Sequence, residues 1–243
     1  MPHRFEQPTE FEFEVDPEVV WDAISTGPGL SSWFMGATEV DLDAGTVRTT
    51  MGDFAQESEI VAHEPGRRFS FRGAESPDGR FFAMEFLVEA RESGSTVLRM
   101  VSSGFLPGDD WEDEYEAMLA GGRIHRQTLV EYLAHFAGRP GVAVAAFAPV
   151  GDLDRRWAAM LADLGLTGRE AVGQPVVLSP AGLPAVEGVV DLADAANLGV
   201  RTDAAMLRFT RGFFASGIGH HLFGADAAAE AEAWRSWLAA AAR

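Results

Sequence analysis

The sequence of 243 residues contains no cysteine and no lysine, since all nineteen basic residues are arginine. The absence of cysteine excludes disulfide bonds, cysteine-ligated zinc, iron–sulfur clusters and thiol nucleophiles. The absence of lysine excludes Schiff-base chemistry and the lysine of phosphate-binding loops. The longest nearly unbroken apolar run, Val142 to Val150, is far shorter than the roughly 20 residues that span a bilayer. The segment Met1 to Glu6 has no apolar signal core, so we expect a cytoplasmic protein.

Positive charge is scarce, because nineteen arginines face thirty-seven acidic residues and the net charge is −18. Such a charge repels phosphate backbones and anionic lipids over a Debye length of roughly 8 Å, so we expect neither nucleic acid nor membrane as a partner. Residues 1–138 carry ten arginines and twenty-six acids, whereas residues 139–243 carry nine and eleven, giving net charges of −16 and −2. The change falls at Ala137-Gly138-Arg139-Pro140-Gly141, where glycine caps a helix and proline stops it. We therefore predict two domains, residues 1–138 and 142–243.

The first half has the pattern of several strands followed by one long helix. Phe11, Phe13 and Val15 alternate with glutamates, as in a strand with one buried face. Asp16-Pro17 caps and opens a short helix, and Asp109-Asp110 starts a helix of about 26 residues with an apolar stripe. This order predicts an α+β fold in which a curved antiparallel sheet wraps around a long C-terminal helix and encloses apolar space. The strands predicted between the helices are Thr46–Met51, Glu57–His63, Arg68–Gly73, Phe81–Glu89 and Thr96–Ser102.

The second half repeats this order in a shortened form. A strand is predicted at Val142 to Ala148, a helix at Asp152 to Leu164 and a closing helix at Ala225 to Ala242. Without gaps, residues 60–71 align over residues 189–200 in apolar pattern more than in identity. We predict a second, shortened α+β unit that is a degenerate duplicate of the first; the alternative is an accessory segment packed on it. Its remaining strands are predicted at Pro175–Leu178, Glu187–Leu192, Leu198–Arg201, Met206–Thr210 and Gly217–Phe223.

Several short segments of the first 138 residues occur together in one known group of proteins. They are Val20 to Ile24, Gly29-Leu30, Trp33-Phe34, Pro65 to Phe69, Gly94 to Leu98, Ser103 to Phe105 and Trp111 to Phe136. In combination they resemble the SRPBCC superfamily, which is START-like and has the helix-grip fold, in the branch of homologues of the activator of the Hsp90 ATPase. The resemblance implies a seven-stranded antiparallel sheet that grips a long C-terminal helix around an apolar cavity. It implies little about function, because one fold hosts many unrelated tasks.

The middle of the predicted closing helix departs from that family. Relatives typically have Gly-Trp there, whereas this chain has Gly121-Gly122. A buried tryptophan covers about 150–250 Å², worth on the order of 4–6 kcal/mol at about 25 cal/mol per Å². In addition, each of two glycines in the middle of a helix lowers the stability of the helix by about 1 kcal/mol relative to alanine. Either a larger cavity admits a ligand, or another element packs on the bare helix, with the second domain as the obvious candidate.

Catalytic motifs are mostly absent, and we predict no catalytic residue, no metal and no cofactor. There is no Gly-x-Ser-x-Gly elbow, no phosphate-binding loop and no His-Glu-x-x-His sequence. His220 and His221 are neighbours on a predicted strand, so we expect one to point inward and one outward, which does not suit a shared metal ion. His125 lies on the inward stripe of the closing helix. One interpretation is that His125 acts as a hydrogen-bond donor or general base in a cavity. The other is that it has no functional role, with its hydrogen bonds made within the protein or its ring exposed at the cavity rim.

Two groups of charged residues each leave two interpretations. Glu85 and Arg99 fall on strands predicted to be neighbours, where they either orient a polar ligand or, as we favour, pair across the outer sheet surface. The acidic run Asp109 to Glu116 either binds a cation or a basic partner, or is the solvated start of a helix whose dipole favours acids.

Three functions remain open at this point. The preferred one is a non-catalytic protein that holds a small hydrophobic or amphipathic ligand in a cavity between sheet and C-terminal helix. The second is an acidic protein-interaction or co-chaperone-like regulator, as the resemblance implies, which binds a protein partner through its N-terminal domain. The third is a cyclase-like or aromatase-like enzyme that uses His125 with a carboxylate. The residues predicted to line the cavity are Trp33, Phe54, Phe71, Met84, Phe86, Met118, Gly122 and His125.

Overall fold

The computed structural model describes residues 3–92, 94–106, 111–212 and 215–241. Within these ranges, side chains are described except at residues 3, 111–114, 116–118 and 120. The described residues form an α+β fold with two antiparallel sheets, one of seven and one of six strands. The predicted fold class and helix-grip architecture are confirmed. The predicted helix start at Asp109-Asp110 lies outside the described residues, as do most side chains of the acidic run.

The first sheet belongs to the N-terminal half of the chain. Its strands are β1 (His3–Phe13), β2 (Ala37–Asp41), β3 (Thr46–Met51), β4 (Phe54–Glu64), β5 (Arg68–Gly73), β6 (Phe81–Ala90) and β7 (Thr96–Leu106). They stand in the order β1-β7-β6-β5-β4-β3-β2, and all neighbours are antiparallel. Helices α1 (Pro17–Ser25) and α2 (Gly27–Ser31) connect β1 to β2, and α3 (Trp111–His135) follows β7.

Local sequence explains how α1 and α2 fit together. Asp16 caps α1 by accepting a hydrogen bond of 2.8 Å from the N–H of Glu18. Thr26 caps α2 in the same way, accepting a bond of 3.0 Å from the N–H of Gly29. A Cβ atom at Gly29 would lie 1.9 Å from the carbonyl oxygen of Asp22 in α1. Only glycine therefore permits the close approach of the two helices.

Two elements of this half were not predicted from the sequence. Helix α2 is five residues long, too short to show a helical period. Strand β2 buries Thr38 and only half-buries Val40, so its alternation is not one of apolar residues. Neither element carries the hydrophobic periodicity on which the prediction rests.

The second sheet belongs to the C-terminal half. Its strands are β8 (Val142–Phe147), β9 (Pro175–Leu178), β10 (Val186–Ala193), β11 (Asn197–Arg201), β12 (Ala205–Thr210) and β13 (Gly217–Leu222). Their order is β8-β13-β12-β11-β10-β9. Helix α4 (Leu153–Asp163) connects β8 to β9, and α5 (Ala227–Ala241) follows β13. Both sheets thus place their first strand beside their last, with the other strands in reverse order, and the second has one strand fewer.

A shared irregularity adds to the likeness of the two sheets. Strands β4 and β10 hold equivalent positions, and each has a break in register, between Ile60 and Ala62 in β4 and between Val190 and Leu192 in β10. The alignment of residues 60–71 over 189–200 pairs these two strands. It places the bulge of β4 one residue away from the bulge of β10. Strand order and bulge both support a degenerate duplicate. The duplication stays a prediction, as does the division into domains 1–138 and 142–243.

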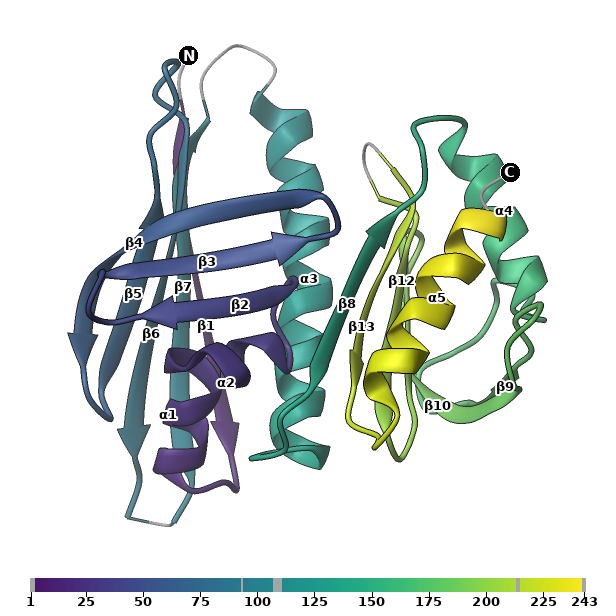
Figure 1. Cartoon of the computed structure of the whole chain (residues 1–243). Helices are drawn as coiled ribbons and strands as arrows, with labels where there is room; N and C mark the ends of the chain where they lie inside the picture. The colour runs from purple at the N-terminus through teal and green to yellow at the C-terminus, as the bar shows by residue number, and fades with distance from the viewer. Residues whose placement is uncertain (1–2, 93, 107–110, 213–214, 242–243) are drawn as a thin grey trace.

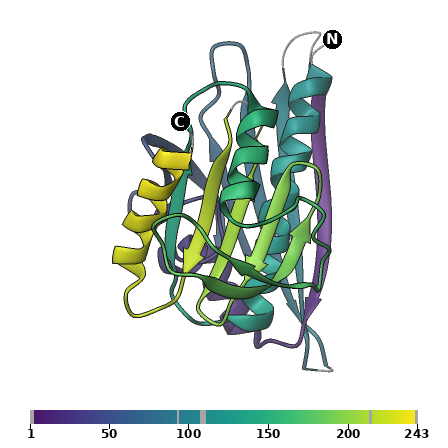
Figure 2. The same cartoon turned by 90° about the vertical axis from the view of Figure 1, so that its right-hand side faces the viewer.

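Helix α3 lies between the two sheets and packs against both (Figure 1). On the far side of the second sheet, α5 covers β8 and β13, and α4 lies beside α5 (Figures 1 and 2). The layers therefore follow one another as first sheet, α3, second sheet, and the pair α4 and α5. The second sheet covers the outer side of α3, which is the packing that the glycine pair led us to consider.

Residues of the second half complete the core of the first. That core lies between the first sheet and α3, and it includes Met206 of β12, which is fully buried. Phe223 follows β13 and stacks on Phe136 just after α3, with ring centroids 4.3 Å apart. A second core lies between the second sheet, α4 and α5 and is centred on Phe209 and Trp234. The two halves are joined by apolar packing as well as by the chain.

Candidate functional site

A cavity of about 370 Å³ lies between the first sheet and α3. Its volume falls near the lower end of the roughly 300–1,000 Å³ that is usual for small-molecule sites. Aromatic and methionine side chains make up most of the wall, and a few polar groups complete it, which is the usual composition of a ligand pocket. The described wall residues are Gln7, Trp33, Phe34, Met35, Gln56, Phe82, Met84, Met100, Ser102, Gly121, Gly122, His125 and Arg126.

The strand register brings the floor of this cavity together. Met84 of β6 stands opposite Ser102 of β7, and Ser102 stands opposite Gln7 of β1. Phe82 and Met100 are two residues from Met84 and Ser102, so the alternation of a strand turns them to the same face. The hydroxyl of Ser102 donates to the sulfur of Met84 at 3.2 Å. The floor is therefore apolar, with one hydroxyl and one amide set into it.

Trp33 and Phe34 form the end wall next to α2. The indole N–H of Trp33 donates to the carbonyl oxygen of Ala23 at 2.8 Å, which fixes the ring. Trp33 lies edge-on to Phe86 at 6.1 Å between ring centroids, and Phe34 lies edge-on to Phe71 at 6.2 Å. These two rings separate Phe86 and Phe71 from the cavity.

The glycine pair of α3 opens the opposite wall. A Cβ atom at Gly121 would meet no heavy atom within 4 Å. A Cβ atom at Gly122 would lie 2.9 Å from Nη1 of Arg126, the tip of a flexible side chain one turn along the helix. Free space thus remains beside the glycine pair, and the second sheet packs on the same helix. Whether this space admits a ligand stays a prediction.

Four of the eight residues predicted to line the cavity do so, namely Trp33, Met84, Gly122 and His125. Phe71 and Phe86 belong instead to the packed core behind the cavity wall. The prediction for Phe54 is wrong, because its side chain is 58% exposed beside the turn that joins β3 to β4. The side chain of Met118 lies outside the described residues. Whether the four lining residues bind a ligand stays a prediction.

Several wall residues were not predicted. Gln56 lies two positions beyond Phe54 on the same face of β4 and takes the place that we assigned to the phenylalanine. Gln7 lies on the inner face of β1, where its amide donates to the hydroxyl of Tyr115 at 3.1 Å. Arg126 lies one turn after Gly122, a spacing at which helical side chains meet. Only this last signal was available in the sequence.

His125 is half-buried, and it lines both this cavity and a second one on the other side of α3. Burial lowers the pKa of His125 to about 4, and the neighbouring charge of Arg126 contributes in the same direction. The imidazole is therefore neutral near pH 7 and provides one hydrogen-bond donor and one acceptor. Its ring lies 6.1 Å from that of Phe34, between centroids.

The second cavity has a volume of about 240 Å³ and lies between α3 and the second sheet. It shares four wall residues with the first cavity: Phe34, Met35, Gly121 and His125. Its other described wall residues are Met51, Ile124, Thr128, Ala145, Phe147, Arg208, Thr210, Ile218, Gly219 and His221. Gly121 thus borders both cavities, whereas Gly122 borders only the first.

A buried ion pair joins α3 to the second sheet beside this cavity. Arg208 donates from Nε to the hydroxyl of Thr128 at 2.8 Å and from Nη1 to Asp191 at 3.0 Å. Asp191 lies at the bulge of β10, which turns its side chain toward the arginine. A Cβ atom at Gly199 would lie 2.2 Å from the Asp191 carboxylate, so glycine makes room for the pair. Burial raises the pKa of Asp191, although Arg208 opposes the change.

His220 and His221 point to opposite faces of β13, as predicted, but both faces are covered. His220 packs edge-on against Trp234 of α5 at 4.7 Å between ring centroids. His221 lies toward the first half of the chain, with Nδ1 3.0 Å from the carbonyl oxygen of Ser31. Both side chains are buried. The outward histidine thus faces protein instead of water, because the second sheet packs on α3.

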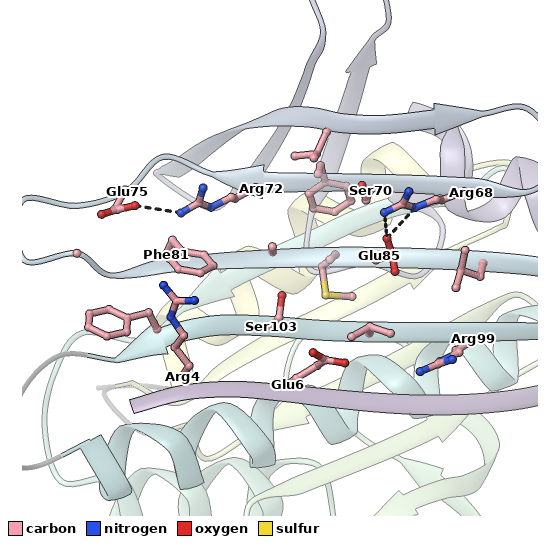
Figure 3. Close-up of a pocket in the computed structure, with 18 of the residues that line it drawn as sticks. Arg4, Glu6, Arg68, Ser70, Arg72, Glu75, Phe81, Glu85, Arg99 and Ser103 are labelled. Carbon is pink, nitrogen blue, oxygen red and sulfur yellow. Dashed lines mark hydrogen bonds and ion pairs between the residues drawn. The ribbon is translucent and has the colours of Figure 1, made fainter. Parts of the chain in front are cut away.

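The outer face of the first sheet carries a charged groove of about 920 Å³ over β1, β7, β6 and β5 (Figure 3). There, Arg68 donates hydrogen bonds from its Nε and Nη2 atoms to the carboxylate of Glu85. The predicted pairing of Glu85 with Arg99 is wrong, because Arg99 stands opposite Leu87 in the sheet register. The prediction that Glu85 and Arg99 lie on the outer face of the sheet is correct. Arg72 lies over the ring of Phe81 at 4.0 Å and binds Glu75 at 3.0 Å.

Two structural searches of the described residues gave negative results. Within that part of the chain, no group of three or more histidine, aspartate or glutamate side chains is placed to hold a metal ion. None of the helices described is both long and apolar enough to cross a membrane.

Comparison with protein families shows which known family the N-terminal half is similar to. Residues 14–134 match the model of the activator of Hsp90 ATPase homolog 1-like proteins. The matched segment begins just after β1 and ends within the last turn of α3, so it includes the described walls of the first cavity except Gln7. No curated protein matches the sequence.

Comparison with solved structures gives several matches at low identity. Protein MLL2253 from Mesorhizobium loti is 21% identical with a TM-score of 0.45, and the match covers 54% of this chain and 97% of that one. The Aha1 dimer from Colwellia psychrerythraea is 18% identical with a TM-score of 0.41, covering 53% and 96%. DynU16, a putative protein in the dynemicin biosynthetic locus, is 16% identical with a TM-score of 0.45, covering 98% and 95%.

Proposed function

Residues 14–134 of this chain belong to the family of activator of Hsp90 ATPase homolog 1-like proteins, and from that premise we propose that the cavity between the first sheet and α3 binds a small hydrophobic or amphipathic molecule. The observation that carries the proposal is free space of about 370 Å³ beside Gly121 and Gly122. The proposal makes the protein a cytoplasmic carrier or sensor that leaves its ligand chemically unchanged.

The chemistry of the wall supports this function. Trp33, Phe34 and Phe82 supply rigid aromatic surface, and Met84 and Met100 supply flexible thioethers that adapt to ligands of different shape. Removal of apolar ligand surface from water provides the affinity, worth about 25 cal/mol per Å² before the cost of association. The few polar groups of the wall then fix the orientation of the ligand.

A variant that fills the cavity tests the proposal. Gly122→Trp places an indole in the free space, and the three described heavy atoms nearest to its Cβ all belong to the movable guanidinium of Arg126. We expect the affinity for the neutral fluorescent probe N-phenylnaphthylamine to fall at least ten-fold, measured by fluorescence titration. Gly224→Trp is the control, because Gly224 is not among the described wall residues of either cavity and its Cβ would meet nothing within 4 Å. Equal affinity in Gly122→Trp and the wild type would refute the cavity as the binding site.

The excess of negative charge in residues 1–138 favours a second candidate function. A net charge of −16 attracts a basic partner, as in the proposed role of a protein-interaction or co-chaperone-like regulator. We expect a synthetic arginine-rich peptide to bind in low salt and to be released as the salt concentration rises. Gly122→Trp leaves this binding unchanged, which separates it from the cavity function.

An enzyme that uses His125 as a base with a carboxylate finds less support. Among the described residues, no aspartate or glutamate lines either cavity. A histidine whose pKa is lowered to about 4 is also a weak base at neutral pH. The chemistry of the described wall therefore supports ligand binding more than catalysis.

A further inference from the structure

Arg126 is the one charged side chain in the described wall of the first cavity. It is half-buried, and none of the hydrogen bonds or ion pairs between described residues involves its guanidinium. The only described side chain that carries a charge beside it and shifts its pKa is Arg123, which has the same sign. Among the described residues, the cavity thus has a cation without a matching anion.

The missing side chain at position 122 allows Arg126 to take this place. The guanidinium lies over Gly122, with Nη1 2.9 Å from where a Cβ atom would be. Any larger residue at position 122 displaces the guanidinium from this position. Gly122 therefore both enlarges the cavity and lets the charge of Arg126 reach its wall.

The charge of Arg126 persists under all physiological conditions. Burial and the nearby charge of Arg123 lower its pKa, but a guanidinium does not lose its proton in proteins. A partly desolvated cation is costly unless it is paired, and no described acid lines either cavity. The neighbouring His125 adds a neutral donor and acceptor without changing the charge. The site therefore favours a ligand that brings one negative charge with it.

We propose that the ligand of this cavity is a small amphipathic anion, whose apolar body lies on the methionine and aromatic floor and whose carboxylate or similar oxyanion binds Arg126. This inference rests on the proposed binding function and goes beyond it by naming the chemical class of the ligand. Arginine suits the role because its planar fork donates two parallel hydrogen bonds to one carboxylate.

Three probes with the same apolar chain and different head groups test the inference. Decanoate, decanol and decylamine each compete with N-phenylnaphthylamine for the full-length protein, at neutral pH and one salt concentration. We expect decanoate to bind at least ten-fold more tightly than decanol, a difference of about 1.4 kcal/mol, and decylamine to bind most weakly.

Two single substitutions assign the preference to one side chain. Arg126→Gln is expected to abolish the ten-fold preference for decanoate over decanol. Arg123→Gln is the matched control: Arg123 carries the same charge three residues away, is exposed, and contacts Asp194 at 3.4 Å instead of the cavity. We expect it to keep the preference.

The outcomes separate the two proposals. If decanol and decanoate bind equally to the wild type, the anion inference is wrong and the binding function stands. If no probe binds, the binding function itself is wrong. If Arg126→Gln keeps the preference for decanoate, Arg126 is only a solvent-directed side chain at the cavity edge and the assignment is overturned.

Discussion

At the scale of single residues, a buried ion pair between Arg208 and Asp191 lies at the contact between α3 and the second sheet. Arg208 is 1% exposed and Asp191 7% exposed, so both are held away from water. Their hydrogen bonds do not satisfy every polar atom, because Nη2 of Arg208 and Oδ2 of Asp191 have no partner among the described residues. Such a pair contributes little net stability when intact and becomes costly when one member is removed.

Removal of the arginine alone is therefore expected to be strongly destabilising. Arg208→Met leaves the Asp191 carboxylate buried without its cation, and we expect the free energy of unfolding to fall by about 3–5 kcal/mol. The double variant Arg208→Met with Asp191→Asn is expected to recover much of that loss. Urea denaturation measures both. The exposed pair Arg235–Glu232 is the control, and Arg235→Gln changes stability by less than about 0.5 kcal/mol. Equal losses in the single and double variants would show that the ion pair is not the cause.

Buried histidines predict a dependence of stability on pH. Burial lowers the pKa of His221 to about 3 and that of His125 to about 4, from 6.5 in the unfolded chain. Below pH 6.5 the unfolded chain therefore binds more protons than the folded one, so acidification lowers the free energy of unfolding. The stabilising contribution is complete above that pH, and each histidine accounts for at most about 1.4 kcal/mol per pH unit.

The variant His221→Asn isolates this effect. We expect it to flatten the fall in the free energy of unfolding between about pH 6.5 and 4, measured by urea denaturation at a series of pH values. The slope is the readout, because loss of the contact with Ser31 lowers stability at every pH. His63→Asn, at an exposed position of β4, is expected to leave the slope unchanged. An unaltered slope in His221→Asn would contradict the assignment.

At the scale of elements, the sequence predicted those with a strong period and missed what depends on distant contacts. The bounds of β3, β5 and β9 match the predictions, because apolar alternation between turn residues defines them locally. The same alternation placed Met84 in the cavity wall, and helical spacing placed His125 there. The alternation failed for Phe54, which lies on the correct face of β4 but at its exposed first position. The position of a residue along the strand, as well as its face, decides whether its side chain lines the cavity.

Contributions of the second sheet to the site left no local signal. Strand β13 is buried on both faces, a situation usually marked by a continuous apolar run. Here the run is interrupted by His220-His221, and β12 is interrupted by Arg208. Some of their polar groups bind partners far away in the sequence: Arg208 donates to Thr128, and His221 contacts the carbonyl oxygen of Ser31. Such pairings follow from tertiary packing and cannot be seen in one chain segment.

Helix α3 carries a prediction at this scale, because its glycine pair lowers its intrinsic stability. A Cβ atom at Gly121 meets nothing within 4 Å, so Gly121→Ala is expected to raise the free energy of unfolding by about 0.5–1 kcal/mol. Gly29→Ala is the contrasting variant, since its Cβ would lie 1.9 Å from the Asp22 carbonyl oxygen and must destabilise. The urea midpoints of both variants measure these changes in stability. Destabilisation by Gly121→Ala would contradict the prediction and would mean that a methyl group does not fit beside Gly121.

At the scale of the whole molecule, the layers are continuous from the first sheet to α5. Met206 belongs to the first core, Phe223 stacks on Phe136, and Arg201 binds Glu131 of α3 at 2.9 Å. We therefore expect both halves to unfold together. Urea transitions followed by far-ultraviolet circular dichroism and by tryptophan fluorescence should coincide at one midpoint.

Weakening the contact between the halves is expected to separate these transitions. Phe223→Ala removes the ring stacked on Phe136 and should cost roughly 2–3 kcal/mol, below the 3–5 typical of fully buried rings because Phe223 is only partly buried. Phe54→Ala, at an exposed ring, is the control and should change stability by less than about 0.5 kcal/mol. Separate midpoints in the wild type would contradict the single cooperative unit.

The wall shared by the two cavities has a consequence for regulation. Gly121 and His125 border both spaces, so a molecule that moves either of them on one side changes the room on the other. Thermodynamic linkage makes such an influence mutual: occupancy of one chamber alters the affinity of its neighbour by the same factor in both directions. Phe34, Met35, Gly121 and His125 are the four described residues that border both spaces, so any such coupling would pass through them.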